Sequence, residues 1–140
     1  MSTAPEASPP ARPRRRSLLL DRLLRWVGGV VAVLAALVTG FVELIFVAVR
    51  VAGHLIGLSI PLAVLANLAL SWFAYRTVGR RWAVALPAAT WFALMVVAAG
   101  GTSEGDFLIA GNNWVGLVMI FAGAVTFAAA AYRLMIPARP

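Results

Sequence analysis

The sequence predicts an all-α membrane protein, a bundle of four transmembrane helices joined by short loops. The first observation is composition: the chain of 140 residues is 62% hydrophobic and only 12% charged, whereas a soluble domain usually carries about 25% charged residues. The second is that four long apolar runs are separated by short polar stretches. The third is that the basic residues are distributed very unevenly around those runs.

The first segment, residues 1–17, is expected to be a disordered cytoplasmic tail. It is rich in proline and arginine, and it holds too little apolar surface to offset the entropy of ordering it. The run RRRSLLL has a superficial likeness to a twin-arginine export signal, but Asp21, Arg22 and Arg25 interrupt what would be its apolar region. We therefore expect no cleavage there. Residues 18–25 predict a short interfacial helix that leads into the first span.

The four apolar runs predict four membrane spans. A helix needs about 20 apolar residues to cross about 30 Å of hydrocarbon. The expected spans cover about residues 26–49, 58–75, 82–99 and 113–132 of a membrane domain at 18–134, and a short cytoplasmic tail follows at 135–140.

The arginines predict the orientation of these spans. All twelve basic residues are Arg, and Arg50 alone falls on the side opposite the other eleven. This positive-inside pattern predicts a multi-pass protein of the bacterial inner membrane with both termini cytoplasmic. The arginines would face the anionic headgroups of membrane lipids, so the net charge of +7 does not indicate a nucleic-acid partner. Trp and Tyr residues fall at the expected interfaces, except for Trp91, which lies inside a span.

Small residues recur at every fourth position in the spans and predict close helix packing, because helices in lipid associate through small side chains. The stripe of the first span is Gly28, Ala32, Ala36 and Gly40; that of the second is Ser59, Ala63, Asn67 and Ser71; that of the third is Ala85, Ala89 and Ala93; and the fourth contains Gly116, Gly123 and the run 128–131. Each stripe could pack within a tight bundle or form an interface with another protein.

Glu43 is the main candidate among the polar residues Glu43, Arg50, His54 and Asn67. At about 100° per residue, Glu43 lies on the same side of the helix as the small stripe, as would Arg50 and His54 if the helix continues that far. Ionisable groups in a membrane usually have a function. Glu43 could pair with Arg50, cap a neighbouring helix, stay protonated beside Asn67, or relay protons. His54 is expected to be a solvated headgroup contact.

Two prolines bear on the helices. Pro61 lies near the start of the second span, where proline is tolerated. Pro87 lies deeper in the third span and is expected to kink it.

The stretch between the last two spans is expected to be an external turn. Glu104 and Asp106 need water, and three glycines permit a tight connection. Phe107, with the two apolar residues after it, should return to the interface or pack against the bundle. The E-G-D spacing lacks the ligand set of a calcium loop. With one His and no Cys, we expect no metal, no cofactor and no catalytic residue.

The turn also carries a family resemblance. The stretch SEGDFLIAG, followed by an apolar final span, resembles a family of small four-span actinobacterial membrane proteins of unknown function, which have an E-G-D-F turn before the last helix. The resemblance covers about residues 26–134. It implies the same bundle and an inner-membrane location, and it implies no catalytic residues.

Three classes of function remain after this reading. The first is a non-catalytic accessory or assembly subunit of a larger membrane complex, favoured by the small stripes and short loops, and it is the one we expect. The alternative is a small proton-coupled transporter that uses Glu43. The third class, a membrane enzyme, is disfavoured by the scarcity of catalytic side chains.

Overall fold

A computed structural model of the chain describes residues 15–100, 109 and 113–136. Of the tails expected at 1–17 and 135–140, residues 1–14 and 137–140 lie outside the described residues, as do Glu104, Asp106 and Phe107 of the external turn. Residues 15–17 belong instead to α1, and Met135 belongs to α4. The elements, in chain order, are α1 (Arg15–Val47), β1 (Arg50–Val51), β2 (His54–Leu55), α2 (Ser59–Val78), the 3₁₀ helix η1 (Arg81–Val84), α3 (Ala85–Ala99) and α4 (Trp114–Met135).

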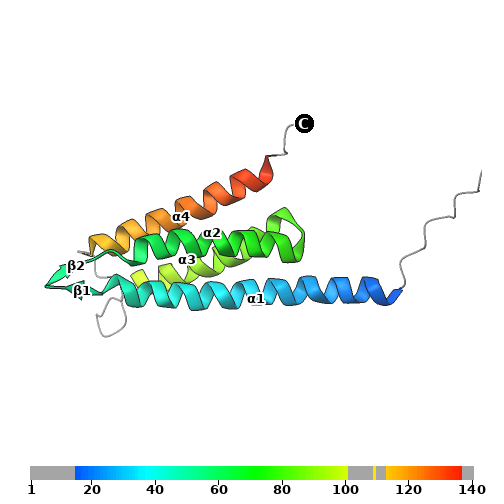
Figure 1. Cartoon of the computed structure of the whole chain (residues 1–140), viewed down its shortest axis with the longest axis horizontal. Helices are drawn as coiled ribbons and strands as arrows, with labels where there is room; N and C mark the ends of the chain where they lie inside the picture. The colour runs from blue at the N-terminus through cyan, green and yellow to red at the C-terminus, as the bar shows by residue number, and fades with distance from the viewer. Residues whose placement is uncertain (1–14, 101–108, 110–112, 137–140) are drawn as a thin grey trace, which may run out of the picture.

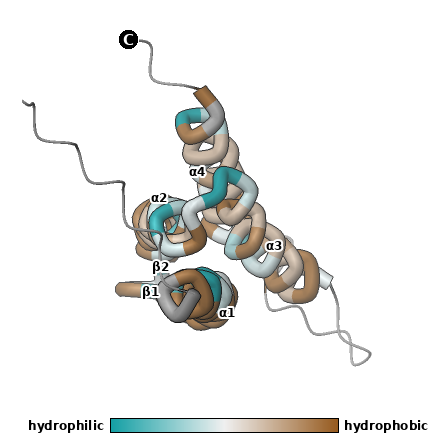
Figure 2. The backbone as a smooth tube through the Cα atoms, turned by 90° about the vertical axis from the view of Figure 1, so that its right-hand side faces the viewer, coloured by the Kyte–Doolittle hydropathy of each residue, from teal (hydrophilic) through white to brown (hydrophobic). Residues whose placement is uncertain are grey.

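The four helices run up and down along the long axis of the molecule, with α3 and α4 inclined relative to α1 and α2 (Figures 1 and 2). The start of α1, the η1 turn and the end of α4 lie at one end of the bundle, and the β1–β2 hairpin lies at the other (Figure 1). The prediction of an all-α membrane fold is confirmed to this extent: three helical stretches, Leu18–Val47, Arg81–Ala99 and Trp114–Leu134, are long and apolar enough to cross a membrane. They indicate a multi-pass membrane protein.

α2 is the central helix, and it packs against α1, α3 and α4. It is not among the three most apolar stretches. Its polar residues Ser59, Asn67 and Ser71 are all buried in the bundle. A helix can carry such groups on the side that faces its neighbours, because they do not face lipid there, whereas Leu65, Leu68 and Trp72 on the other side of α2 are exposed.

The small stripe of α1 faces the other helices. Gly28, Ala32, Ala36 and Gly40 are all buried. At Gly28 an added Cβ would lie 2.7 Å from the Cβ of Thr77 on α2, so the glycine is required for this close approach. α1 also continues without a break through residues 18–25, where the sequence predicted an interfacial helix leading into the span.

α1 ends at Val47. Arg50 and His54 therefore lie outside the helix and do not share a side of it with Glu43. Instead the chain forms a two-residue hairpin turn, in which Ala52 has φ 49° and Gly53 has φ 84°. Positive φ at both positions matches the twist of a tight hairpin. β1 and β2 pair Arg50 with Leu55, and both Arg50 and His54 are exposed.

Pro87 lies near the start of α3 and not deep within it, and the kink expected there stays a prediction. α3 begins at Ala85, because η1 occupies the preceding residues. Pro87 therefore lies in the first turn, where a backbone N–H has no partner within the helix and its loss costs nothing.

Candidate functional site

The candidate site is a buried polar centre at which all four helices meet. Glu43 of α1 is fully buried, and one of its carboxylate oxygens, Oε2, accepts a hydrogen bond of 2.7 Å from Nε1 of Trp91 on α3. Gly40, one turn before Glu43, lets α3 approach: an added Cβ there would lie 2.7 Å from Cδ2 of Leu94 and 3.5 Å from Cδ1 of Trp91. The small stripe of α1 thus positions its carboxyl group against an indole donor.

Trp91 is itself fully buried, and it extends from α1 to α4. Its six-membered ring lies against Gly123 of α4, where an added Cβ would be 2.5 Å from Cζ2 and 2.6 Å from Cη2. The ring of Phe127, one turn further along α4, tilts against it at 5.8 Å between centroids. Gly123 therefore provides the space that the indole occupies, and Trp91 bridges the polar group to the fourth helix.

Asn67 brings α2 into the same centre. Its side chain is fully buried, and its Nδ2 lies 2.9 Å from the position that a Cβ on Gly123 would take. The hydroxyl of Ser71, one turn later, donates to the backbone carbonyl of Asn67 at 2.7 Å. Trp91 and Asn67 thus converge on one glycine from two different helices.

Several buried polar atoms of the bundle, most of them in this centre, have no hydrogen-bond partner among the described residues. They are Oε1 of Glu43, Nδ2 and Oδ1 of Asn67, and Oγ of Ser59. In contrast, Thr39, Thr77, Thr90 and Thr126 each donate to a carbonyl of their own helix. The centre therefore has donors and acceptors that can still form hydrogen bonds, and leaving them unpartnered in an apolar interior is costly. It can lock the helices together, or it can exchange a proton or a polar ligand.

The other polar residues that the sequence singled out lie elsewhere. Arg50 and His54 are exposed on the hairpin, and within the described chain no ion pair joins Arg50 to Glu43. Ala63, of the second stripe, is fully buried in the core with Trp91 and Met119. Glu104, Asp106 and Phe107 fall outside the described residues, but Ile109, which closes the expected apolar patch, is buried and donates its N–H to the carbonyl of Ala98 at 3.2 Å.

Sequence reasoning did not assign a role to Trp91 or to Gly123 as its counterpart. A signal was present for the first: Trp91 is the one tryptophan that the sequence places inside a span, away from both interfaces. An indole N–H in hydrocarbon needs an acceptor, and Glu43 is an acidic residue within an expected span. For Gly123, the sequence predicted close helix packing but not the residue that it packs against.

Comparison with protein-family models, curated proteins and solved structures finds no match to this chain. The resemblance to the actinobacterial four-span family therefore stays a prediction. The structure itself describes a helical protein with three stretches able to cross a membrane and a polar centre among its four helices.

Proposed function

We propose that the protein is a four-span bundle of the bacterial inner membrane, with both termini cytoplasmic, and that it acts as a non-catalytic accessory or assembly subunit of a larger membrane complex. The fourth span of this proposal is α2. Its 20 residues are enough to cross the hydrocarbon, and it lies between α1 and α4. Its lower hydropathy has a local cause, since its polar residues face the bundle interior.

The distribution of charge supports the orientation. In the view along the bundle, hydrophilic segments are present at the end that faces the viewer, which is formed by the start of α1, the η1 turn and the end of α4 (Figure 2). Arg22, Arg25, Arg76, Arg81 and Arg133 belong to helix turns at this end. Arginine enrichment on one side of a membrane favours the cytoplasmic side.

An uncovered alanine stripe on α3 carries the subunit proposal. Ala85, Ala89 and Ala93 are all exposed, whereas Trp91 and Met95 on the opposite side of the helix are buried in the bundle. The stripe is therefore not used to pack this fold. Small residues that face lipid allow a second helix to approach closely, and close approach is what stabilises helix association in a membrane.

The geometry of the polar centre favours a structural role for Glu43. One carboxylate oxygen is engaged by Trp91, and the side chain is fully enclosed by the other helices. Of the two cavities that we describe in this fold, neither is lined by Glu43. A fixed contact that holds α1 against α3 needs no access path, whereas transport requires one.

Affinity purification tests the subunit proposal. The tagged protein is isolated in mild detergent, and mass spectrometry identifies the membrane proteins that are recovered with it. Ala89→Leu places a bulky side chain on the uncovered stripe and should reduce that recovery severalfold. Ala128→Leu makes the same change at an exposed alanine of α4 and serves as the control. Equal recovery with both variants, or no membrane protein recovered with the parent, would remove the support for a subunit role.

A proton-coupled transporter is the second candidate, and the unpartnered atoms of Glu43, Asn67 and Ser59 favour it. Glu43→Gln distinguishes the two functions, because glutamine can still accept the bond from Trp91 but cannot ionise. Proton or substrate movement by purified protein in liposomes, abolished by Glu43→Gln while the fold is retained, would establish transport. A silent Glu43→Gln variant together with weakened recovery of Glu43→Ala supports the subunit.

A further inference from the structure

A second feature of the fold is a cleft of about 920 Å³ at the arginine-rich end of the bundle. It opens between the first half of α1 and the segment that joins α2 to α3. Its volume is in the range of about 300–1,000 Å³ that is typical of small-molecule sites in proteins. The polar centre is separate from it, since neither Glu43 nor Trp91 lines the cleft.

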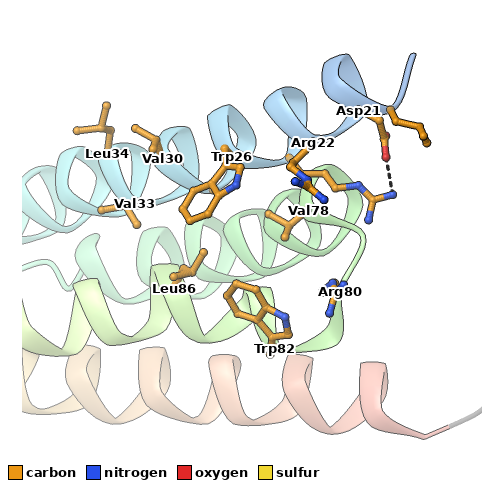
Figure 3. A pocket seen from close by; sticks show the side chains of 13 residues that line it. Asp21, Arg22, Trp26, Val30, Val33, Leu34, Val78, Arg80, Trp82 and Leu86 are labelled. Atoms are coloured by element: carbon orange, nitrogen blue, oxygen red, sulfur yellow. Dashed lines mark ion pairs between the residues drawn. The ribbon is translucent and has the colours of Figure 1, made fainter. Parts of the chain in front are cut away.

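The part of the cleft farther from the arginine-rich end is apolar. Val30, Val33 and Leu34 of α1 line one side, and Leu86 of α3 lines the other (Figure 3). Gly29 lies between them: an added Cβ there would be at an ordinary contact distance of 3.5 Å from Cδ1 of Leu86. This part of the cleft offers only hydrocarbon contacts, so it suits a hydrocarbon chain.

The mouth of the cleft is cationic. Arg22, Arg25 and Arg80 line it together with one acid, Asp21 (Figure 3). Asp21 is already paired with Arg25 at 2.9 Å. In the described part of the chain, the side chains of Arg22 and Arg80 have no such ion pair, and they remain available for an anion at the mouth.

Two tryptophans mark the level of the membrane interface in the cleft. Trp26 of α1 and Trp82 of η1 extend into it from opposite sides, between the arginines and the apolar part of the cleft (Figure 3). Tryptophan is enriched at the boundary between headgroups and hydrocarbon. From Arg25 to Leu34 the axial rise is about 14 Å at 1.5 Å per residue, which is close to one leaflet of a hydrocarbon core about 30 Å thick.

We propose that this cleft binds one anionic phospholipid of the cytoplasmic leaflet. The phosphate would lie at Arg22 and Arg80, the glycerol region between Trp26 and Trp82, and an acyl chain along the apolar wall. Along the cleft, the arginines come first, then the two tryptophans, and then an apolar wall about as long as one leaflet is thick. The parts of a phospholipid follow one another in the same order. An apolar helix from a partner would fill the wall but would leave the two arginines unneutralised.

Native mass spectrometry of protein released from lipid nanodiscs tests the proposal. The nanodiscs contain phosphatidylglycerol and phosphatidylcholine in equal amounts, and the lipid that stays bound is counted and identified. The parent protein should retain one phosphatidylglycerol in preference to phosphatidylcholine. The double variant Arg22→Gln with Arg80→Gln should lower that preference by about 30-fold, the factor that two arginines near an anionic surface provide.

Matched variants separate the cleft from the general charge of this end. Arg76→Gln with Arg133→Gln removes the same charge from helix turns at the same end that do not line the cleft, and it should leave the preference intact. Val33→Phe fills the apolar wall and should abolish retention of both lipids. Val38→Phe, at a position that is 64% exposed and outside the cleft, should not.

Three results would overturn the proposal. The first is equal retention of the two lipids by the parent protein, which is independent of any variant and of its folding. The second is an equal loss of preference in both double-arginine variants, which would show a nonspecific effect of charge. The third is undiminished retention by Val33→Phe, which would place the lipid outside the cleft and leave the cleft to a protein segment.

Discussion

At the scale of single residues, the hydrogen bond from Trp91 to Glu43 allows a carboxyl group to be buried among apolar helices. A buried carboxyl group is costly unless a donor reaches it. Trp91 supplies a donor at 2.7 Å to one oxygen, and the second oxygen remains unpartnered among the described residues. The pair is also long-range, because 48 residues separate its members in the chain. Removing one partner therefore affects the contact between α1 and α3 as well as the side chain itself.

A double-mutant cycle tests this coupling. Trp91→Phe removes the donor and leaves the carboxyl group unsatisfied, which should lower the free energy of unfolding by about 1–3 kcal/mol. Glu43→Leu alone should also destabilise, because it leaves the indole N–H of Trp91 without an acceptor. In the combined variant neither group is left unpaired, so its loss should be smaller than the sum of the two single losses. Thermal or denaturant unfolding in detergent measures all three; strictly additive losses would mean that the bond contributes no coupling.

At the scale of secondary-structure elements, glycine and alanine set how closely the helices approach. Gly28 and Gly40 let α1 contact α2 and α3, and Gly123 lets α4 contact both Trp91 and Asn67. In an apolar solvent this close packing replaces the hydrophobic effect as the source of helix association. The two cavities that we describe lie along α1, at the arginine-rich end and beside Ala35 and Thr39.

Gly123→Ala tests the contact between α4 and the polar centre. The new Cβ would lie within 2.6 Å of two ring atoms of Trp91 and within 2.9 Å of the Asn67 amide. Overpacking of this kind costs about 1–3 kcal/mol, because the ring has to move as a rigid body. We expect a lower midpoint of thermal unfolding in detergent.

The matched change Gly29→Ala is the control for helix propensity. Its Cβ would meet only Leu86 at 3.5 Å and Val78 at 3.8 Å, which are ordinary contacts. Alanine is the better helix former by about 1 kcal/mol, so this variant should be as stable as the parent or more so. If Gly123→Ala behaved in the same way, α4 would not pack against Trp91 as described.

At the scale of the whole molecule, the arrangement places the hairpin and the η1 turn at opposite ends of the bundle (Figure 1). If α2 crosses the membrane, these two connections lie on opposite sides. If α2 does not cross it, they lie on the same side, and the chain has three spans instead of four. The orientation of the protein and the role of its arginines depend on which arrangement holds.

Cysteine labelling in intact cells distinguishes these arrangements. The chain has no native cysteine, so single replacements report one position each. Ala52→Cys, in the exposed hairpin, should react with a membrane-impermeant thiol reagent. Arg80→Cys, before η1, and Ser8→Cys should react only after the membrane is permeabilised. Labelling of Ala52→Cys and Arg80→Cys but not of Ser8→Cys in intact cells would show that α2 does not cross the membrane, and labelling of the last two alone would reverse the orientation.

The sequence by itself determined the properties that depend on local composition. In hydrocarbon, a single apolar run can satisfy all its backbone hydrogen bonds by itself only as a helix, so long apolar runs predict helices regardless of their neighbours. The bounds of the later helices accordingly lie within about three residues of those expected: α2 begins at Ser59 and α4 at Trp114, where the sequence predicted starts at 58 and 113. The clustering of arginine and the small stripe on α1 could also be read from the sequence, because each is a local pattern along the chain.

The tertiary structure alone decided which residues meet. A helical repeat shows which side chains share a side of one helix, but the rotation of that helix relative to its neighbours depends on packing across the whole bundle. α3 illustrates the limit. It is apolar all round, so its sequence could not show that Trp91 turns inward to Glu43 while Ala85, Ala89 and Ala93 turn outward. α1 ends at Val47, so Arg50 and His54 lie outside the helix. This end likewise depends on the tertiary structure, because the hairpin that follows forms only when the chain reverses and β1 pairs with β2.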